Sequence, residues 1–306
     1  MRIVVTGAAG GIGRAVLPDL VTRGHEVVAV DRVLPGTREP GSGGVGAAPA
    51  EGPSDFRDAA GIEWLLGDGR DESLLARALA GADALIHLAA IPTPLLGTPV
   101  EVFASNTQTT FTALEAAGTA GVARAVIASS ISLLGLPYAT GPLSPLYAPV
   151  DEAHPNIGTD AYALSKEADE RTAAMMHRRH GYQVVALRIP ATAPMAVHLE
   201  RQRHVAWDPS YLANELWAYL DVRDAARAFG LAVERDIPGL HVINVMAPDT
   251  YSGLPTAELM ARAHPGTVLR RPLVGRESVF DTTRGRELLG FVPSHRLVFG
   301  ELKGDQ

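Results

Sequence analysis

The residues best suited to carry chemistry are a tyrosine and a lysine four positions apart, Tyr162 and Lys166. On a helix such residues share a face, so the lysine ammonium lies near the tyrosine hydroxyl. A nearby positive charge stabilises the phenolate form, which can exchange a proton with an alcohol or carbonyl oxygen. Ser130 follows the apolar run Ala125 to Ala128 and can hydrogen-bond the same oxygen. We therefore predict Ser130, Tyr162 and Lys166 as catalytic residues, although Tyr-x-x-x-Lys alone also occurs by chance on surface helices.

A glycine-rich segment, residues 6–13 (Thr-Gly-Ala-Ala-Gly-Gly-Ile-Gly), lies between the first apolar run and the first helical pattern. Gly7 permits a tight turn, Gly10 lets the backbone approach a pyrophosphate, and Gly13 allows the helix to pack on the strand. The amides and positive dipole of the helix N-terminus then face the anion. An ordinary glycine-rich turn is the alternative, and the strand–loop–helix context makes it the weaker one. The predicted dinucleotide contacts here are Gly7, Gly10, Gly11, Ile12 and Gly13.

A carboxylate after the second apolar run favours NAD as the dinucleotide. Asp31 closes Val27 to Val30 at the spacing from the glycine loop that such sites require. It can accept hydrogen bonds from both ribose hydroxyls and would repel a 2′-phosphate. The next residue, Arg32, can pair with that phosphate, so NADP stays open as an alternative. A strand-ending turn residue is the other interpretation of Asp31.

Alternating strands and helices must position these residues. Short apolar strands between longer amphipathic helices predict an α/β fold, a Rossmann-type doubly wound parallel sheet covered on both faces. Strands are predicted at Ile3 to Val5, Val27 to Val30, Trp64 to Leu66, Ala84 to Leu88, Ala125 to Ala128, Val184 to Leu187 and Val242 to Val245. Helices are predicted at Ile12 to Thr22, Glu72 to Leu79, Val100 to Ala117, Ala161 to His180, Val222 to Glu234, Thr256 to Ala263 and Thr283 to Leu289.

The pattern becomes irregular after about residue 190, with prolines at 190, 194 and 209. The later pieces are too broken for a second sheet and predict a small C-terminal substrate-binding lobe over the carboxyl edge of the main sheet. We predict a dinucleotide-binding domain over 1–189, completed by about 220–245, and a lobe formed by 190–219 and 246–306. Residues 35–54, rich in Gly, Pro, Ala and Ser, predict a mobile surface loop, with a functional lid as the alternative.

Composition narrows the class of protein. The 306 residues are 46% apolar and 20% charged, as in soluble enzymes, and the net charge of −7 argues against a nucleic-acid partner. The chain has no cysteine, which excludes disulfides and thiolate nucleophiles and fits a cytoplasmic location. No apolar stretch is long enough for a membrane span, and no His-Glu-x-x-His or comparable spacing predicts a metal site.

The most basic short run near the expected substrate edge is His198 to His204. Its Arg201 and Arg203 are candidate substrate contacts, since arginine binds carboxylates and phosphates bidentately. A solvated helix face is the more common role of such runs and is the interpretation we favour. His87, within an apolar strand, is predicted to be a hydrogen-bonded core histidine.

Together these motifs resemble the extended short-chain dehydrogenase/reductase family, whose members include sugar-nucleotide epimerases, dehydratases and reductases. The glycine motif, Tyr162 with Lys166, Ser130 followed by Gly135, and residues 219–224 carry a resemblance that runs over most of the chain. The resemblance implies that Lys166 holds the nicotinamide ribose and that a homodimer forms through the helices at 100–117 and 161–180. It implies further cofactor contacts at Asp68, Gly69, Leu88, Ala89, Ala90, Asn106 and Pro190.

The sequence departs from that family where a substrate would bind. After Arg188 the family usually continues with an asparagine and a Tyr-Gly-Pro-like turn, whereas residues 191–194 here read Ala-Thr-Ala-Pro. The short stretch between Pro190 and Tyr219 leaves little chain to wrap a nucleotide. We therefore predict hydride transfer between NAD(P) and a secondary alcohol or ketone of a compact polar small molecule, sugar-like or acidic.

Two other functions stay open. A nucleotide-sugar epimerase or dehydratase would use the same residues, with tightly held NAD oxidising and then re-reducing the sugar. A non-catalytic NAD-binding redox sensor would keep the glycine loop but usually lose Tyr162 or Lys166. Both residues are present, so the sensor is the weakest of the three hypotheses.

Overall fold

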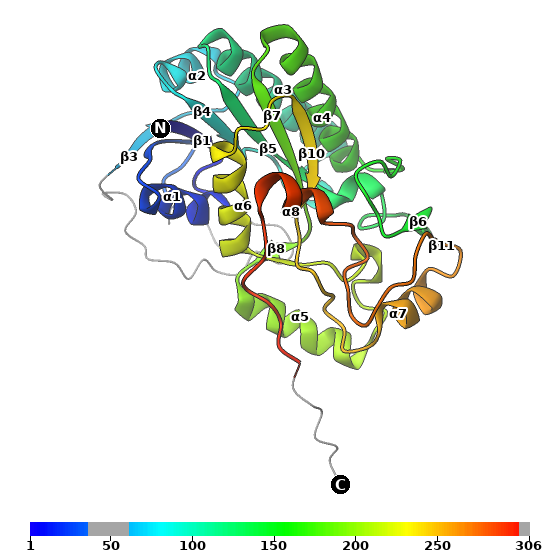
Figure 1. The fold of residues 1–306 in the computed structure, drawn as a ribbon. Helices are drawn as coiled ribbons and strands as arrows, with labels where there is room; N and C mark the ends of the chain where they lie inside the picture. Colours follow the sequence, from blue (N-terminus) through cyan, green and yellow to red (C-terminus); the bar gives the residue numbers. More distant parts are fainter. Residues whose placement is uncertain (36–60, 300–306) are drawn as a thin grey trace.

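The computed structural model describes residues 1–35 and 61–299, and its centre is a seven-stranded parallel sheet (Figure 1). The strand order is β10-β7-β5-β4-β1-β2-β3, so the direction of winding reverses at β1. This confirms the predicted Rossmann-type doubly wound sheet. The strands are β1 (Arg2–Thr6), β2 (Glu26–Asp31), β3 (Ile62–Leu66), β4 (Ala84–His87), β5 (Arg124–Ser130), β7 (Gln183–Ile189) and β10 (Leu240–Asn244).

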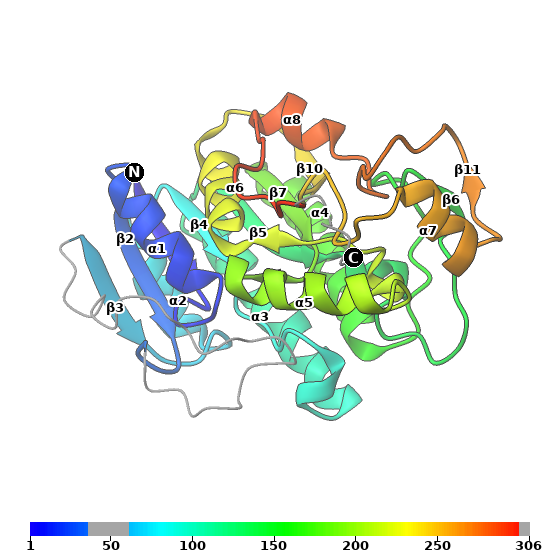
Figure 2. The same ribbon diagram turned by 90° about the horizontal axis from the view of Figure 1, so that it is seen from below.

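Helices cover both faces of this sheet, as Figures 1 and 2 show. One face carries α1 (Gly13–Thr22), α6 (Val222–Glu234) and α8 (Thr283–Leu289). The other carries α2 (Glu72–Leu79), α3 (Pro99–Thr119) and α4 (Ala161–His180). Because both faces are covered, the central strands are mostly apolar, and β7 is buried at every position.

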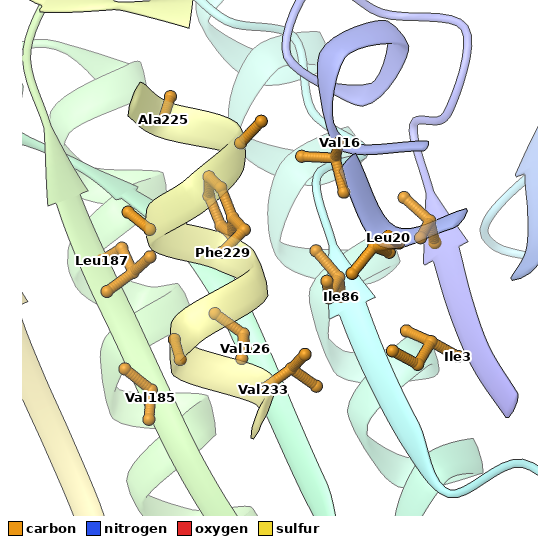
Figure 3. Close-up of a cluster of buried hydrophobic side chains, with 14 of the residues drawn as sticks. Ile3, Val16, Leu20, Ile86, Val126, Val185, Leu187, Ala225, Phe229 and Val233 are labelled. Carbon is orange, nitrogen blue, oxygen red and sulfur yellow. The ribbon is translucent and has the colours of Figure 1, made fainter. Parts of the chain in front are cut away.

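The core on the first face shows how α1 and α6 are held to the sheet (Figure 3). Val16 of α1 and Phe229 of α6 are fully buried among strand residues that include Ile86 and Val126. Removing a buried aromatic side chain such as Phe229 typically costs about 3–5 kcal/mol. This packing fixes the start of α1, and with it the glycine loop, against the end of β1.

The start of α4 is set by a side-chain cap. Asp160 Oδ1 accepts hydrogen bonds from the amides of Tyr162 and Ala163, both at 2.9 Å. An aspartate at this position satisfies amides that have no partner within the helix. At the other end, Gly181 adopts φ +80°, a left-handed conformation that favours glycine after a helix. The cap places Tyr162 in the first turn of α4, next to the sheet edge.

A smaller lobe lies at the carboxyl end of the sheet. Its apolar core is a separate cluster that includes Trp217, Tyr219 and Tyr251, together with residues between 131 and 150. These residues between 131 and 150 belong to the predicted dinucleotide-binding domain of 1–189, yet they pack in this cluster. The domain boundaries at 189, 219 and 245 stay a prediction. The lobe contains α5 (Met195–Trp207), α7 (Thr256–Ala263) and two short parallel pairs, β6 (Tyr147–Ala148) with β11 (Val268–Leu269) and β8 (Thr192–Ala193) with β9 (Leu220–Asp221).

The helix α5 was anticipated only in the interpretation of His198 to His204 as a helix face, and it was not among the helices predicted from the apolar pattern. Its sequence is barely amphipathic, and the prolines at 190, 194 and 209 indicated irregular chain. Pro194 is instead the residue that precedes the first turn, where its missing amide hydrogen costs nothing.

The predicted loop at 35–54 lies outside the described residues, apart from Pro35. Within the two described ranges, no helix is long and apolar enough to cross a membrane. The same ranges hold no group of three or more His, Asp or Glu side chains placed to bind a metal ion.

Candidate active site

A cavity of about 860 Å³ lies over the carboxyl ends of the central strands. Its walls include the last residue of β1, Thr6, and the last residues of β2, β5 and β7, Asp31, Ser130 and Ile189. Open α/β sheets bind ligands at this edge, where the strand order reverses. Of the residues predicted to bind cofactor or substrate, all but Asn106 and Arg203 line this cavity.

The glycine loop has the geometry that close approach to an anion requires. Gly7 has φ +68°, and a Cβ there would lie 2.6 Å from the amide nitrogen of Ala89. A Cβ on Gly13 would lie 2.5 Å from the Gly7 carbonyl oxygen. At Gly10 a Cβ would approach the same oxygen at 3.1 Å, whereas at Gly11 it would meet open space. Gly7 and Gly13 therefore have structural reasons to be glycine, and Gly10 and Gly11 leave the backbone exposed to a ligand.

The start of the helix that follows lines the cavity. Ile12 precedes α1 without a side-chain hydrogen bond to the first turn. The Arg14 and Ala15 amides donate to the Gly10 and Ile12 carbonyl oxygens, and Gly11, Ile12 and Gly13 line the cavity ahead of them. Such a helix N-terminus binds phosphate groups. The loop and the start of α1 thus fit the pyrophosphate of a dinucleotide.

Asp31 holds the loop as well as lining the cavity. Its Oδ2 accepts a hydrogen bond from the Ala9 amide at 2.9 Å, and its Oδ1 accepts one from the Arg32 amide at 2.7 Å. The exposed Arg32 also lines the cavity, near Asp68. Bidentate pairing with Arg70, with a smaller effect of Arg32, lowers the pKa of Asp68 to about 2. Carboxylates and an arginine thus meet where the adenosine ribose of a dinucleotide would lie.

Ser130 ends β5 with its side chain buried at the cavity wall. Its Oγ accepts a hydrogen bond from the Ser132 amide and donates one to the Ser132 Oγ, both at 3.0 Å. The following turn, η3 (Ile131–Leu134), ends at Gly135, where φ is +75° and a Cβ would lie 2.6 Å from the Ile157 carbonyl oxygen. Ser132 also lines the cavity. Our sequence reasoning missed it, although a serine two positions after Ser130 was the available signal.

Tyr162 and Lys166 face the same cavity from α4. The Tyr162 ring meets that of Tyr138 edge-on, with centroids 6.3 Å apart. The Nζ of Lys166 lies 5.8 Å from the Tyr162 ring centroid. The helix spacing therefore brings the two predicted catalytic side chains together, and Tyr138 adds an aromatic wall that the sequence did not predict.

Lys166 is buried and tightly held. Its Nζ donates hydrogen bonds to the Ala128 carbonyl oxygen at 3.0 Å and to Asp169 Oδ2 at 3.1 Å. Burial alone would favour the neutral amine, but the Asp169 carboxylate and then Tyr162 outweigh it and raise the pKa of Lys166. The ammonium is therefore charged at neutral pH. Asp169 was not predicted, because a carboxylate three residues after a lysine is common on exposed helices.

A series of buried hydrogen bonds connects Thr6, His87 and Thr110 beside the cavity. The Oγ1 of Thr6 lies 2.7 Å from His87 Nδ1, and the Thr110 Oγ1 lies 3.2 Å from His87 Nε2. Burial, with the nearby Lys166 charge, lowers the pKa of His87 to about 3. His87 is thus a neutral, hydrogen-bonded core histidine, as the apolar strand around it predicted.

Asn106, expected to contact the cofactor, lies outside the cavity lining and is fully buried. Its amide accepts a hydrogen bond from the Ile91 amide at 2.7 Å and donates to the Ile91 carbonyl at 3.1 Å. It also donates to Ser165 Oγ at 3.0 Å. Asn106 therefore joins α3 and α4 to the segment after β4, whose residues 88–93 line the cavity.

The basic run on α5 divides between the interior and the surface. His198 is fully buried and lies 2.5 Å from the Tyr251 hydroxyl, so the run is not a uniformly solvated helix face. Arg201 lines the cavity, whereas Arg203 is exposed and outside it. The helical period explains the difference, since residues two apart point to different sides. The lobe adds Tyr211 and Glu215 to the lining, neither of which was predicted.

Known proteins resemble this chain in sequence and fold. The UDP-glucose 4-epimerase of Corynebacterium glutamicum is 24% identical over 329 residues, covering 96% of this chain and 92% of that protein. The L-arabinose 1-dehydrogenase (NAD(P)(+)) of Haloferax volcanii is 30% identical over 193 residues, covering 61% of this chain and 66% of that protein. The structure of MoeE5 in complex with UDP-glucuronic acid and NAD has a TM-score of 0.67 and 24% identity, covering 97% of this chain and 95% of that chain.

The sequence model of the NAD dependent epimerase/dehydratase family matches residues 3–245. That match spans the sheet, the glycine loop and the helix positions of Tyr162 and Lys166, and it confirms the resemblance to extended short-chain dehydrogenases/reductases. It also confirms NAD as the expected cofactor. The chain belongs to the NAD-dependent epimerase/dehydratase family.

Proposed function

We propose that this protein is an NAD-dependent dehydrogenase that oxidises a secondary alcohol of a compact, sugar-like substrate. The observation that carries the proposal is the cavity in which Ser130, Tyr162 and Lys166 meet the glycine loop. The part of this cavity formed by the lobe is poor in cations. The meeting of Ser130, Tyr162 and Lys166 with the glycine loop supports alcohol oxidation. The shortage of cations on the lobe side limits the substrate to a compact molecule.

The side chains suit the removal of a hydroxyl proton. Ser130 hydrogen-bonds the substrate oxygen, and the Tyr162 phenolate accepts its proton, while the charged Lys166 stabilises that phenolate. As the carbonyl forms, the carbon gives up its hydrogen as hydride. The nicotinamide, when bound, supplies the acceptor for that hydride. The products are a ketone or lactone, reduced dinucleotide and one proton, so electrons and protons balance.

The distribution of arginines favours a compact substrate. Among the described residues that line the cavity, the cations are Arg14, Arg32, Lys166 and Arg201. Arg14 and Arg32 belong to the glycine-loop end, and Lys166 is paired, which leaves Arg201 on the lobe side. Three other arginines of the lobe are occupied by carboxylates: Arg270 pairs with Asp151, and both Arg276 and Arg296 pair with Asp249. A nucleotide diphosphate would normally need several convergent donors.

A nucleotide-sugar epimerase is the second candidate. The similarity to the UDP-glucose 4-epimerase covers nearly the whole of both chains, whereas the similarity to the arabinose dehydrogenase is partial. An epimerase would use the same Tyr162, Lys166 and Ser130. A redox sensor without catalysis has less support, because the catalytic side chains are present and meet in the cavity.

The proposal includes a cytoplasmic homodimer formed through α3 and α4. These helices expose apolar side chains, with Val100 76%, Phe111 46% and Leu164 54% exposed. A twofold axis at such a surface would bury the same side chains from both subunits.

A substrate panel separates the candidates. Purified protein with NAD is mixed with neutral monosaccharides, with uronates, or with UDP-glucose and UDP-galactose, and NADH is followed by absorbance. We expect NADH to accumulate in proportion to the sugar oxidised with at least one free sugar. Interconversion of UDP-glucose and UDP-galactose without net NADH would instead favour the epimerase.

A further inference from the structure

Two charged side chains of the lobe line the same cavity, and each has a buried polar atom that lacks a hydrogen-bond partner. Arg201 projects from α5, and Glu215 ends the short turn η4 (Ala213–Glu215); both line the cavity that contains Tyr162. Arg201 Nη1 and Glu215 Oε2 are buried and have no hydrogen-bond partner among the described residues. Buried polar atoms are nearly always paired, so two unpaired atoms in one cavity wall indicate a missing ligand.

The chain keeps Glu215 in place at the expense of backbone strain. Leu212, Leu216 and Trp217 have φ of +64°, +52° and +52°, and they are the non-glycine residues with positive φ in the described ranges. Left-handed backbone is unfavourable for such side chains and persists where surrounding packing enforces it, most often at functional sites. Here Trp217 is fully buried, and its Nε1 donates to the Pro209 carbonyl at 2.9 Å.

Arg201 is held from the opposite side. On the same helix, His198 is 2.9 Å from the Leu220 carbonyl and 2.5 Å from the Tyr251 hydroxyl, which fixes α5 against the lobe. Burial works against the Arg201 charge, but Tyr251 and Glu215 outweigh it and raise the pKa of Arg201. Burial raises the pKa of Glu215, and the Arg201 charge offsets part of that rise. The two side chains therefore form a weakly compensated pair of opposite charges.

We propose that Arg201 and Glu215 together bind neighbouring hydroxyl groups of a neutral sugar and select against acidic sugars. This proposal rests on the proposed dehydrogenase function. An arginine only donates hydrogen bonds and a carboxylate only accepts them, whereas a hydroxyl group does both. A vicinal diol can therefore satisfy Arg201 Nη1 and Glu215 Oε2 at once. A carboxylate or diphosphate would pair with Arg201 but would be repelled by Glu215.

The test compares neutral and acidic sugars of matched shape. D-galactose with D-galacturonate, and D-glucose with D-glucuronate, are assayed in the presence of NAD for kcat/KM and for the shift in melting temperature. Wild type, Glu215→Gln, Arg201→Gln and Arg203→Gln are compared. Arg203→Gln is the matched control, because Arg203 lies two residues away on the same helix but is exposed and outside the cavity.

Wild type should prefer the neutral sugar of each pair by about tenfold or more, the usual size of a hydrogen bond to a charged group. Glu215→Gln should narrow that preference by a similar factor, and Arg201→Gln should lower kcat/KM for the neutral sugar. Arg203→Gln should leave both ratios unchanged. If Glu215→Gln does not fold, the proposal is still tested by the wild-type ratio of kcat/KM for the neutral and acidic sugars and by the kcat/KM of Arg201→Gln.

Different results would overturn the Arg201–Glu215 proposal and the dehydrogenase function. Preference of the wild type for the uronate, or an unchanged ratio in Glu215→Gln, would overturn the Arg201–Glu215 proposal and leave the dehydrogenase standing. Absence of NADH with every sugar, while NAD still raises the melting temperature, would overturn the dehydrogenase. In that case the melting-temperature shifts of neutral and acidic sugars decide the Arg201–Glu215 proposal: larger shifts with the acids, or none with either, would overturn it.

Discussion

The buried ion pair between Lys166 and Asp169 allows stability and catalysis to be changed separately. Their side chains are 5% and 1% exposed, and the two charged atoms are 3.1 Å apart. Removing one partner of a buried pair leaves an uncompensated charge and typically costs about 3–5 kcal/mol. We expect Lys166→Met and Asp169→Asn each to lower the free energy of unfolding by roughly that amount.

The double variant Lys166→Met/Asp169→Asn should recover most of that stability, because no buried charge is left unpaired. Activity should not recover. The Lys166 Nζ lies 5.8 Å from the Tyr162 ring centroid. At an effective dielectric constant of about 20, a charge at that distance stabilises a phenolate by about 3 kcal/mol. Losing it should lower kcat about a hundredfold in both Lys166→Met and the double variant.

Urea unfolding gives the stabilities, and NADH formation at saturating NAD and sugar gives kcat. Glu167→Gln on the same helix is the control, since its pair with Arg171 is 3.9 Å long and exposed and should contribute less than about 1 kcal/mol. The reasoning is refuted if the double variant is as unstable as either single variant. A double variant with wild-type kcat would refute the catalytic half.

Three further predictions concern the glycine loop, the choice of cofactor and the response to acid. Gly13→Ala places a Cβ 2.5 Å from the Gly7 carbonyl oxygen and should cost about 1–3 kcal/mol and weaken NAD binding, whereas Gly11→Ala, whose Cβ meets no protein atom, should leave the stability of the NAD-free protein unchanged; Gly13→Ala melting curves that match those of wild type both without and with NAD would contradict this. Asp31→Asn keeps an acceptor for the Ala9 amide but loses the charge, so calorimetric titration should show a smaller preference for NAD over NADP, and tighter NADP binding by the wild type would contradict the expectation. The pKa of His87, about 3, lies below its unfolded value near 6.5, so its contribution to stability is complete above pH 6.5 and falls toward pH 3. From pH 6.5 to 5 this loss of stability is about 2 kcal/mol. His87→Gln should therefore flatten the dependence of the free energy of unfolding on pH in that range. An equal slope in wild type and His87→Gln would contradict this expectation.

The sheet and its helices could be predicted because their signals are local. Buried parallel strands read as short apolar runs, and α2 and α6 carry a clear apolar period. The helix α4 is as weakly amphipathic as α5, but it lies between a capping Asp160 and a terminal Gly181. The helix α5 has neither an apolar period nor a side-chain cap. Its stability comes from contacts distant in sequence, such as that of His198 with Tyr251, which no local window contains.

The same limit applies to the site. Tyr162 with Lys166, and the glycines of the loop, are recognisable because fixed spacing alone brings them together. Glu215 reaches the cavity through a strained turn of the lobe, which the sequence gives no means of placing. Arg203 shows the same limit from the other side: charge and proximity in sequence to Arg201 made it a candidate contact, whereas its side chain is exposed and outside the cavity lining.

The measurement that tests the central claim most directly is the paired determination of kcat/KM and NAD affinity for Tyr162→Phe. This variant keeps the ring against Tyr138 and removes only the hydroxyl group that exchanges the proton. We predict a loss in kcat/KM of about 10²–10⁴-fold, the usual contribution of general acid–base catalysis, with NAD affinity unchanged. A kcat/KM within about twofold of wild type, a barrier change well under 1 kcal/mol, would contradict the assignment of Tyr162 as the catalytic base.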